Sequence, residues 1–141
     1  MSLKIYFAGS IRAGRADAHI YAKIVDILKK YGSVLTEHVG NPNMTEKGDV
    51  LLTDKEIHDR DVDWLKQSDV LVAEVTQVSL GVGYEIGRAV AMGKKTLCLY
   101  RPQPDKRLSA MVRGSADITV VDYSEVQVES ILESYFKTFI R

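Results

Sequence analysis

Hydrophobic residues along the chain alternate between two spacings, which predicts an alternation of strands and helices. Short runs rich in apolar and β-branched residues are typical of strands, and they span Leu3–Phe7, Ser33–Val39, Asp69–Val75, Lys95–Tyr100 and Ile118–Tyr123. Segments with apolar residues every three or four positions are typical of helices, and they span His19–Gly32, Thr53–Gln67, Gly83–Met92 and Ser124–Ile140. The remaining segments are two polar loops and a short helix or turn, at Gly40–Leu52, Arg101–Arg107 and Leu108–Ala116 respectively.

This alternation predicts an α/β domain whose central parallel sheet is covered by helices on both faces. The run Asp69–Val75 is apolar almost throughout, as expected of a buried parallel strand. Ligands of such sheets bind beyond the carboxyl ends of the strands, near a change in strand order. The segments to examine for chemistry are therefore Ala8–Arg15, Val75–Tyr84 and Arg101–Gly114.

Composition narrows the class of protein. The 141 residues predict one domain over 1–141, and 45% hydrophobic with 27% charged residues is ordinary for a globular protein. Basic and acidic residues number 19 each, so we expect neither a nucleic-acid polymer nor a membrane as partner. The one cysteine, Cys98, excludes an internal disulfide and fits a buried thiol. Without an apolar stretch of ~20 residues or a signal-peptide pattern, we expect a cytoplasmic protein, or one shared with the nucleus.

The segment GSIRAGR directly follows the first predicted strand and is a candidate anion site. Gly9 and Gly14 permit close backbone approach, and Ser10, Arg12 and Arg15 carry groups suited to phosphate. The spacing matches neither the dinucleotide fingerprint nor the P-loop. An ordinary strand-to-helix turn with solvated arginines is the alternative.

The stretch SLGVGYEIGRA places a carboxylate where the central strand gives way to a helix. Ser79, Gly81 and Gly83 predict a flexible loop, with Glu85 in the first turn of the helix that follows. A glutamate there is also favoured by the helix dipole, by ~0.3–1 kcal/mol at a surface. The position beyond a central strand favours a functional role.

A second carboxylate, Asp61, falls on the apolar face of its predicted helix, between Ile57 and Trp64. Its neighbours Arg60 and Val62 are expected to point elsewhere. Because a bare buried charge costs several kcal/mol, Asp61 must be paired, hydrogen-bonded or functional. An ion pair with another element is the structural alternative.

Tyr6, near the end of the first strand, is either a core residue or the partner of a carboxylate. Two carboxylates, a phenol and an anion-binding loop predict bond cleavage at an acetal-like carbon. The three histidines are scattered, and neither CxxC nor GxSxG occurs, so no metal site or serine nucleophile is indicated. These patterns do not name the substrate.

Here the sequence resembles a known family, in segments that cover nearly the whole chain in order. The segments IYFAGSIRAGR, LTEHV, IHDRDVDWLKQSDVLVAEVTQVSLGVGYEIGRAVA and LCLYRPQPDKRLSAMVRGSAD are similar to 2′-deoxynucleoside 5′-phosphate N-hydrolases of the nucleoside 2-deoxyribosyltransferase superfamily. The resemblance implies a three-layer Rossmann-like (flavodoxin-like) domain with a five-stranded parallel sheet flanked by helices. Ala8 and Ala13 depart from the family's cysteine and glycine, and Ala13 narrows the backbone angles of the candidate anion loop.

The resemblance also implies a reaction, in which a deoxynucleoside 5′-monophosphate is hydrolysed to free base and 2-deoxyribose 5-phosphate. Glu85 corresponds to the nucleophile at C1′, Tyr6 to the residue that orients it, and Asp61 to the aspartate that helps the base to leave. The implied substrate and phosphate contacts are Gly9, Ser10, Ile11, Arg12, Gly14, Ser79, Gly81, Ser109 and Met111. Ser109 is expected to come from a partner subunit, which makes the active unit a homodimer. No metal or organic cofactor is expected.

Two other functions stay open at this point. The first is a deoxyribosyltransferase that passes the sugar of an unphosphorylated nucleoside to a second base, although Ser79 and Ser109 favour a phosphorylated substrate. The second is a non-catalytic nucleotide-binding module, which the joint presence of Tyr6, Asp61 and Glu85 disfavours. The preferred base cannot be read from any motif.

Overall fold

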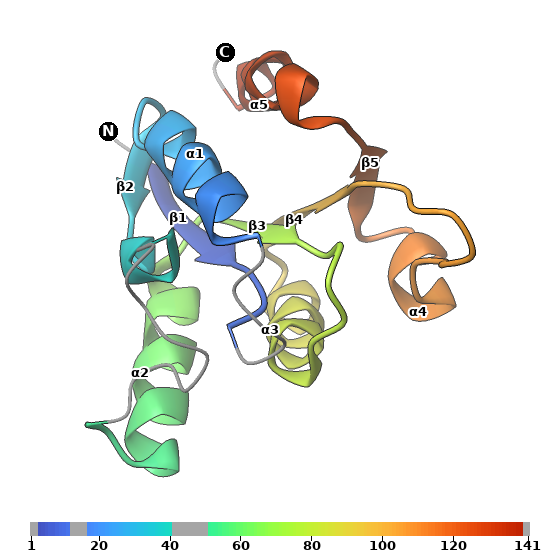
Figure 1. Ribbon diagram of the computed structural model, residues 1–141. Coiled ribbons are helices and arrows are strands. Elements are labelled where there is room, and N and C mark those ends of the chain that lie inside the picture. The colour runs from blue at the N-terminus through green and yellow to red at the C-terminus, as the bar shows by residue number, and fades with distance from the viewer. Residues whose placement is uncertain (1–2, 12–16, 41–50, 140–141) are drawn as a thin grey trace.

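A computed structural model describes residues 3–11, 17–40 and 51–139, and its centre is one parallel sheet (Figure 1). Five strands pair in the order β2-β1-β3-β4-β5, each parallel to its neighbours. Their bounds are β1 (Leu3–Ala8), β2 (Gly32–Val34), β3 (Val70–Glu74), β4 (Lys95–Tyr100) and β5 (Thr119–Asp122). This is the flavodoxin-like order, and the chain reverses direction across the sheet between β1 and β3. The predicted fold class is confirmed.

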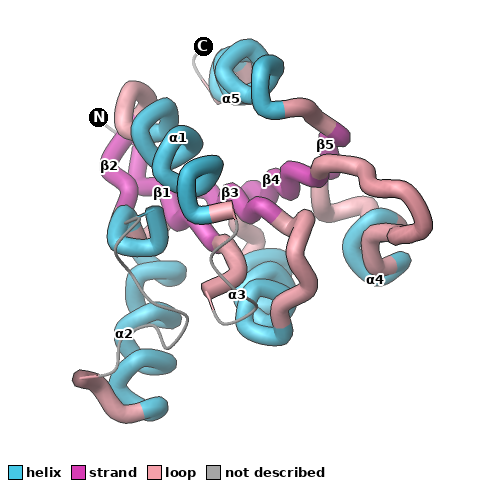
Figure 2. The backbone as a smooth tube through the Cα atoms, in the orientation of Figure 1, coloured by secondary structure: helices cyan, strands magenta, loops and turns pink. Residues whose placement is uncertain are grey.

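Helices cover both faces of the sheet, as Figures 1 and 2 show. One face carries α1 (Ala18–Leu28) and α5 (Val128–Lys137), and the other carries α2 (Asp54–Gln67), α3 (Leu80–Ala91) and the short α4 (Ala110–Arg113). Because side chains alternate along a strand, β1 sends Phe7 into the first core and Tyr6 into the second. Every residue of β3 is buried, as predicted for a strand with neighbours on both edges and both faces.

The second strand is shorter than the sequence pattern predicts. Of the predicted strand Ser33–Val39, only the part within β2 (Gly32–Val34) joins the sheet. The chain then forms a 3₁₀ helix, η1 (Glu37–Gly40). The reason is a side chain that replaces the backbone ladder: the Thr36 hydroxyl accepts from the Phe7 N–H at 2.8 Å and donates to the Phe7 carbonyl at 2.7 Å. Because the Thr36 hydroxyl satisfies the N–H and the carbonyl of Phe7 near the end of β1, these groups need no backbone partner from the second strand, and β2 ends before them.

Helix α3 begins three residues earlier than predicted, at Leu80 instead of Gly83. Ser79 caps it, and its hydroxyl accepts from the Val82 N–H at 3.2 Å. Glu85 therefore lies beyond the first turn, where the helix dipole has little effect. The prediction that Glu85 sits in the first turn was wrong, and the helix dipole does not account for this carboxylate.

The last predicted helix is also divided, into a 3₁₀ turn η2 (Glu125–Gln127) followed by α5. Among the described helices, none combines the length and the apolar character that a membrane crossing requires.

Candidate active site

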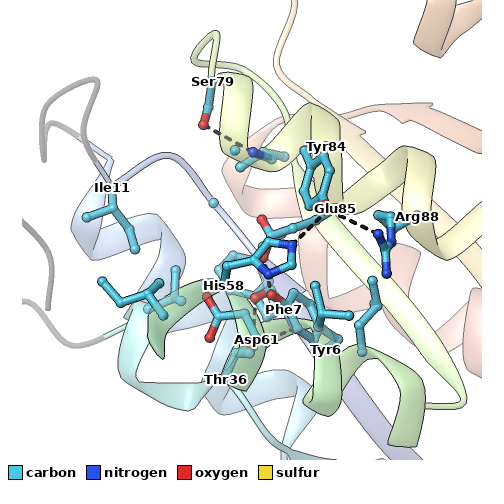
Figure 3. Close-up of a pocket in the computed structure, with 18 of the residues that line it drawn as sticks. Tyr6, Phe7, Ile11, Thr36, His58, Asp61, Ser79, Tyr84, Glu85 and Arg88 are labelled. Atoms are coloured by element: carbon cyan, nitrogen blue, oxygen red, sulfur yellow. Dashed lines mark hydrogen bonds between the residues drawn. The ribbon is translucent and has the colours of Figure 1, made fainter. Parts of the chain in front are cut away.

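A cavity of about 510 Å³ opens beyond the carboxyl end of β1, between α2 and α3 (Figure 3). It lies beside the point where the strand order reverses, which is where ligands of doubly wound sheets bind. Tyr6 reaches it from β1, Asp61 from α2 and Glu85 from α3. The structure thus brings together the three residues predicted to carry the chemistry.

Tyr6 and Glu85 are in direct contact at the base of the cavity. The buried Tyr6 hydroxyl donates a hydrogen bond to Glu85 Oε2 (Figure 3). Burial, together with the nearby charge of Glu85, raises the pKa of Tyr6, so the phenol stays protonated and remains a donor. The hydrogen bond fixes one oxygen of the carboxylate and leaves the other for chemistry.

The carboxyl group of Glu85 has a raised pKa, so it binds a proton more readily than an ordinary glutamate does. Loss of solvation raises the pKa of Glu85 to about 7, the Tyr6 hydrogen bond opposes that rise, and the negative charge of Asp61 adds to it. A carboxyl group so perturbed, and facing a cavity, is a candidate catalytic group. Once ionised it is poorly solvated, which suits a nucleophile.

Asp61 faces the same cavity from the opposite helix, with 24% of its side chain exposed. The expectation that Arg60 and Val62 point away was wrong. Arg60 Nε donates to Asp61 Oδ1 at 2.9 Å, because its long side chain turns back across the Trp64 ring, 4.7 Å from the ring centroid. Val62 is buried. Among the described residues, Asp61 therefore forms its ion pair with its own neighbour in α2 and not with another element.

The segment after β1 forms another wall of the cavity. Gly9 and Ile11 line it, and a Cβ at Gly9 would lie 3.0 Å from the Tyr21 ring, so the position suits only glycine without a shift of that ring. Ser10 between them is buried, and its N–H donates to the Tyr21 hydroxyl at 3.2 Å. The predicted contacts that lie outside the described residues are Arg12 and Gly14.

The start of α3 completes the cavity. Ser79 and Gly81 line it, and a Cβ at Gly81 would meet only the Ser79 hydroxyl, at 3.9 Å. The fold therefore has room for a side chain at Gly81, and the space beside it is open for a ligand.

Ser109 and Met111 do not line this cavity. They border a second, larger hollow of about 1000 Å³ between α3 and the segment that leads into α4, which Ser79 also borders. Ser109 caps α4, where its hydroxyl accepts from the Met111 N–H at 3.2 Å. Within one chain, the structure does not bring these two predicted contacts together with Glu85.

Sequence reasoning missed polar groups at the cavity rim. His58 Nε2 lies 2.8 Å from the Tyr84 hydroxyl, which also accepts from Arg88 at 3.1 Å (Figure 3). A signal was present for His58, which precedes Asp61 by one helical turn and so shares its face. Thr36 and His38 also line the cavity, from the turn and η1 that the pattern assigned to a strand.

A cavity at the switch point, with a tyrosine-bound glutamate opposite an aspartate, is the arrangement expected of enzymes that cleave a glycosidic bond with two carboxylates. The chain belongs to the nucleoside 2-deoxyribosyltransferase family, whose model matches residues 5–129. It is 58% identical over 142 residues to the 5-hydroxymethyl-dUMP N-hydrolase of Danio rerio, with 99% of each chain covered. It is 53% identical over 137 residues to the protein of the same name in Homo sapiens, covering 94% of this chain and 79% of that one.

Solved structures share the fold at lower identity. A CMP N-glycosidase of Clostridium botulinum superposes with a TM-score of 0.64 at 21% identity, covering 92% of this chain and 98% of that one. A 2-desoxiribosyltransferase of Leishmania mexicana superposes with a TM-score of 0.58 at 19% identity, covering 99% of each. The predicted family is confirmed by sequence, and the fold by structure.

Proposed function

We propose that this protein hydrolyses the N-glycosidic bond of 2′-deoxynucleoside 5′-monophosphates. The observation that carries the proposal is the Tyr6–Glu85 hydrogen bond inside a cavity that Asp61 also lines. The names of the relatives support the same reaction, and they make 5-hydroxymethyl-dUMP the first substrate to test. The products are the free base and 2-deoxyribose 5-phosphate.

Glu85 acts as the nucleophile in this proposal. Its free oxygen bonds to C1′ while the bond from C1′ to the base nitrogen breaks, and the electron pair of that bond leaves with the base. Positive charge at C1′ is easier to reach in a 2-deoxy sugar, which lacks the electron-withdrawing 2′-hydroxyl. Tyr6 holds the other oxygen and so sets the angle of attack.

Asp61 manages protons on the opposite side of the cavity. It relays a proton from solvent to the departing base, and it later accepts one from the water that hydrolyses the glycosyl ester. Its location on α2, facing Glu85 on α3, suits both steps. One carboxylate reacts covalently and the other exchanges protons, as in retaining glycosidases.

The phosphate binds at a distance from the bond that breaks, and it supplies binding energy for orientation. Ser79 and the open space beside Gly81 lie at the N-terminus of α3, where free N–H groups and the helix dipole favour an anion. Gly9 and Ile11 line the same cavity from the segment after β1.

A second copy of the chain completes this site in our proposal. Val78, Leu80 and Met111 are apolar yet 90%, 95% and 84% exposed, and all three border the hollow beside α3 and α4. An apolar surface of this kind marks an interface, and a two-fold partner placed on it carries its own Ser109 toward Ser79. The separation of Ser109 from Glu85 within one chain fits this arrangement.

The pH dependence of the reaction follows from Glu85. Since its pKa is raised to about 7 and the nucleophile must be ionised, kcat/KM is expected to rise with pH through about 7. The Tyr6 hydrogen bond stabilises the ionised form of Glu85. Tyr6→Phe should therefore move the acid limb of the pH–rate profile to higher pH and lower kcat about 10-fold. Rate profiles from about pH 5 to 9 measure both effects, and an identical midpoint in the two proteins contradicts the assignment.

Ser109→Ala tests the phosphate contact from the partner. Loss of one hydrogen bond to a charged group should raise the KM for the monophosphate about 10-fold or more and leave the unphosphorylated deoxynucleoside unaffected. Ser130→Ala, on the far face in α5, is the matched control. Equal losses for the two substrates would count against a phosphate role.

Three functions are separated by one assay. The protein is incubated with 5-hydroxymethyl-dUMP, with its unphosphorylated nucleoside and with its ribonucleotide, each with and without free adenine as acceptor. Our proposal predicts base release from the deoxy monophosphate, unchanged by adenine. Transfer of the sugar to adenine would identify a deoxyribosyltransferase, and binding without release would identify a nucleotide-binding module.

A further inference from the structure

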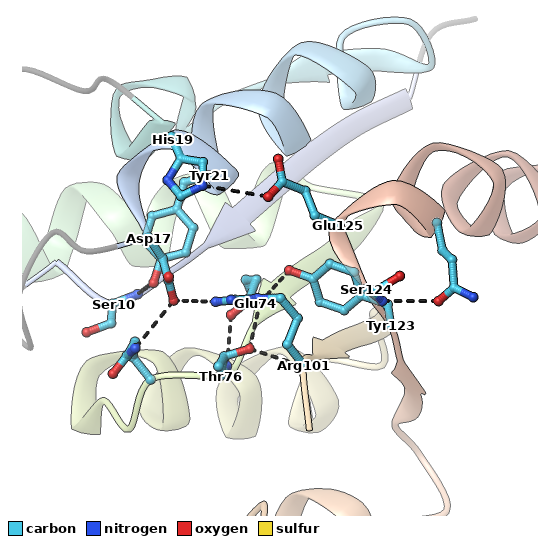
Figure 4. Close-up of polar contacts among 12 residues, drawn as sticks. Ser10, Asp17, His19, Tyr21, Glu74, Thr76, Arg101, Tyr123, Ser124 and Glu125 are labelled. Carbon is cyan, nitrogen blue, oxygen red and sulfur yellow. Dashed lines mark hydrogen bonds and ion pairs between the residues drawn. The ribbon is translucent and has the colours of Figure 1, made fainter. Parts of the chain in front are cut away.

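Two groups of arginine–carboxylate contacts among the described residues are largely shielded from solvent. In the first, Arg101 contacts the carboxylates of Asp17 and Glu74 (Figure 4). These three side chains do not line the cavity beyond β1, and their contacts hold elements of the fold together. In the second, Arg60 contacts Asp61, which lines the cavity. The second group is therefore close enough to the reacting groups to affect the reaction.

The contact between Arg60 and Asp61 depends on a third residue of α2. Consecutive residues of a helix do not face each other, so Arg60 reaches its neighbour by turning back across the ring of Trp64. Its guanidinium carbon lies 4.7 Å from the ring centroid, and its Nε donates to Asp61 Oδ1 at 2.9 Å. The ring attracts the cation and supports the guanidinium plane. The side chains of Arg60 and Asp61 are only 26% and 24% exposed, so solvent screens the pair weakly.

The contact fixes one oxygen of Asp61 and leaves the other available. Among the described residues, Oδ1 accepts from Arg60 and no donor is bonded to Oδ2. A charge-assisted hydrogen bond of this length is stronger than a neutral one, and rotation of the carboxylate would break it. Asp61 faces the cavity (Figure 3), so Oδ2 is the oxygen that exchanges protons with the departing base in the proposed reaction.

The charge of Arg60 also acts inside the cavity. Burial raises the pKa of Tyr6, the charges of Glu85 and Asp61 add to that rise, and the charge of Arg60 opposes it. The guanidinium therefore affects the hydroxyl that contacts Glu85. Burial and the charge of Asp61 also raise the pKa of Glu85, and a cation bound to Asp61 offsets part of the second effect.

We propose that Arg60 is a positioning residue that acts on the departing base through Asp61. It holds Oδ1 so that Oδ2 is presented to the base, and it balances the negative charge of Asp61 beside Glu85. Arg60 itself is not among the residues that line the cavity. This inference rests on the proposed function, because that function gives Asp61 its part in proton transfer.

Arg60→Gln is the test, since it removes both the positive charge and the Nε donor. The kcat/KM for 5-hydroxymethyl-dUMP, which covers the steps up to base release, should fall about 10-fold. For 5-fluoro-dUMP it should fall about 3-fold or less, because the electron-withdrawing fluorine lets the base leave with less help from a proton. A merely structural role would lower both values equally.

The pH profile gives a second readout. The acid limb should move to higher pH in Arg60→Gln, because less of the charge of Asp61 beside Glu85 is then offset. Arg60→Lys keeps the charge and should keep the midpoint of the parent. Lys66→Gln, which removes an exposed cation from the same helix, is the matched control and should retain the rates and the profile. The other described titratable or charged groups around the cavity are Tyr6 from β1, His38 from η1, His58 from α2, and Tyr84, Glu85 and Arg88 from α3.

A double-mutant cycle tests whether Arg60 acts through Asp61. In the Asp61→Asn protein, Arg60→Gln should change kcat/KM by no more than about 2-fold, since the charge that Arg60 holds is already removed. A loss of about 10-fold in that background, or equal losses for the two substrates, would overturn the inference.

If Arg60→Gln does not fold, the cycle is run with Arg60→Lys. The expected loss is then about 3-fold, because an ammonium lacks the planar fork that both stacks on Trp64 and donates to Asp61. A loss of the same size in the Asp61→Asn protein would again overturn the inference. Failure of the parent protein to release base from the monophosphate would instead overturn the proposed function.

Discussion

Glu85→Gln is expected to lower kcat by about 10⁴-fold or more, because it replaces the oxygen that, in our proposal, attacks C1′. The amide oxygen can still accept from the Tyr6 hydroxyl, so the cavity keeps its shape and monophosphate binding should stay detectable. Single-turnover release of free base, followed by chromatography, measures the loss.

The stability of the same variant provides a second readout. Since the pKa of Glu85 is raised from 4.5 to about 7, the folded state disfavours its charge, and the penalty is complete above pH 7 and absent below pH 4.5. Glu85→Gln should therefore melt at a higher temperature than the parent at about pH 8, with the difference vanishing toward about pH 4. Glu133→Gln, an exposed glutamate of α5, is the matched control. Unchanged turnover in Glu85→Gln would refute the assignment of Glu85 as the nucleophile.

Asp61→Asn is expected to lower kcat by about 10²–10⁴-fold, the usual contribution of a positioned proton donor or acceptor. It should also move the acid limb of the rate profile to lower pH, because the charge of Asp61 raises the pKa of Glu85. This shift is opposite in sign to that of Tyr6→Phe, so the two variants distinguish a hydrogen-bond donor from a neighbouring charge.

Asp63→Asn is the control for that experiment, since Asp63 lies on the same helix and, among the described residues, its side chain accepts a hydrogen bond only from the Gln67 amide, at 2.7 Å. It should retain the rate and the profile of the parent. A loss in Asp61→Asn that is matched by Asp63→Asn, or an unchanged acid limb, would contradict the role assigned to Asp61.

The sheet and its helices could be predicted because periodicity reports burial directly. β3 lies between two strands and two helical layers, and the apolar residues 70–73, which make up all of it but Glu74, indicate that burial. Element ends were harder to predict, because single side chains decide them. The Thr36 hydroxyl ends β2, and the Ser79 hydroxyl starts α3, and neither effect leaves a trace in the spacing of hydrophobic residues.

The candidate site was partly predictable for a similar reason. The positions of Tyr6 and Asp61 follow from local rules, namely a strand end and a helix face. Glu85 was predicted in the first turn of its helix but lies beyond it, and the structure brings all three residues together. The contacts of Arg101 with Asp17 and Glu74 span 84 and 27 residues of sequence, and no local pattern encodes such pairs. The contact of Arg60 with Asp61 was not predicted, because a long side chain can turn back along its helix.

The central claim is that Glu85 forms a covalent bond to the sugar. Mass spectrometry of the protein, quenched in acid during turnover of 5-hydroxymethyl-dUMP, tests it most directly. Our account predicts a peptide containing Glu85 that gains the mass of one 2-deoxyribose 5-phosphate residue, and no such gain in Glu85→Gln. An adduct on a different residue, or rapid base release by Glu85→Gln, would contradict it.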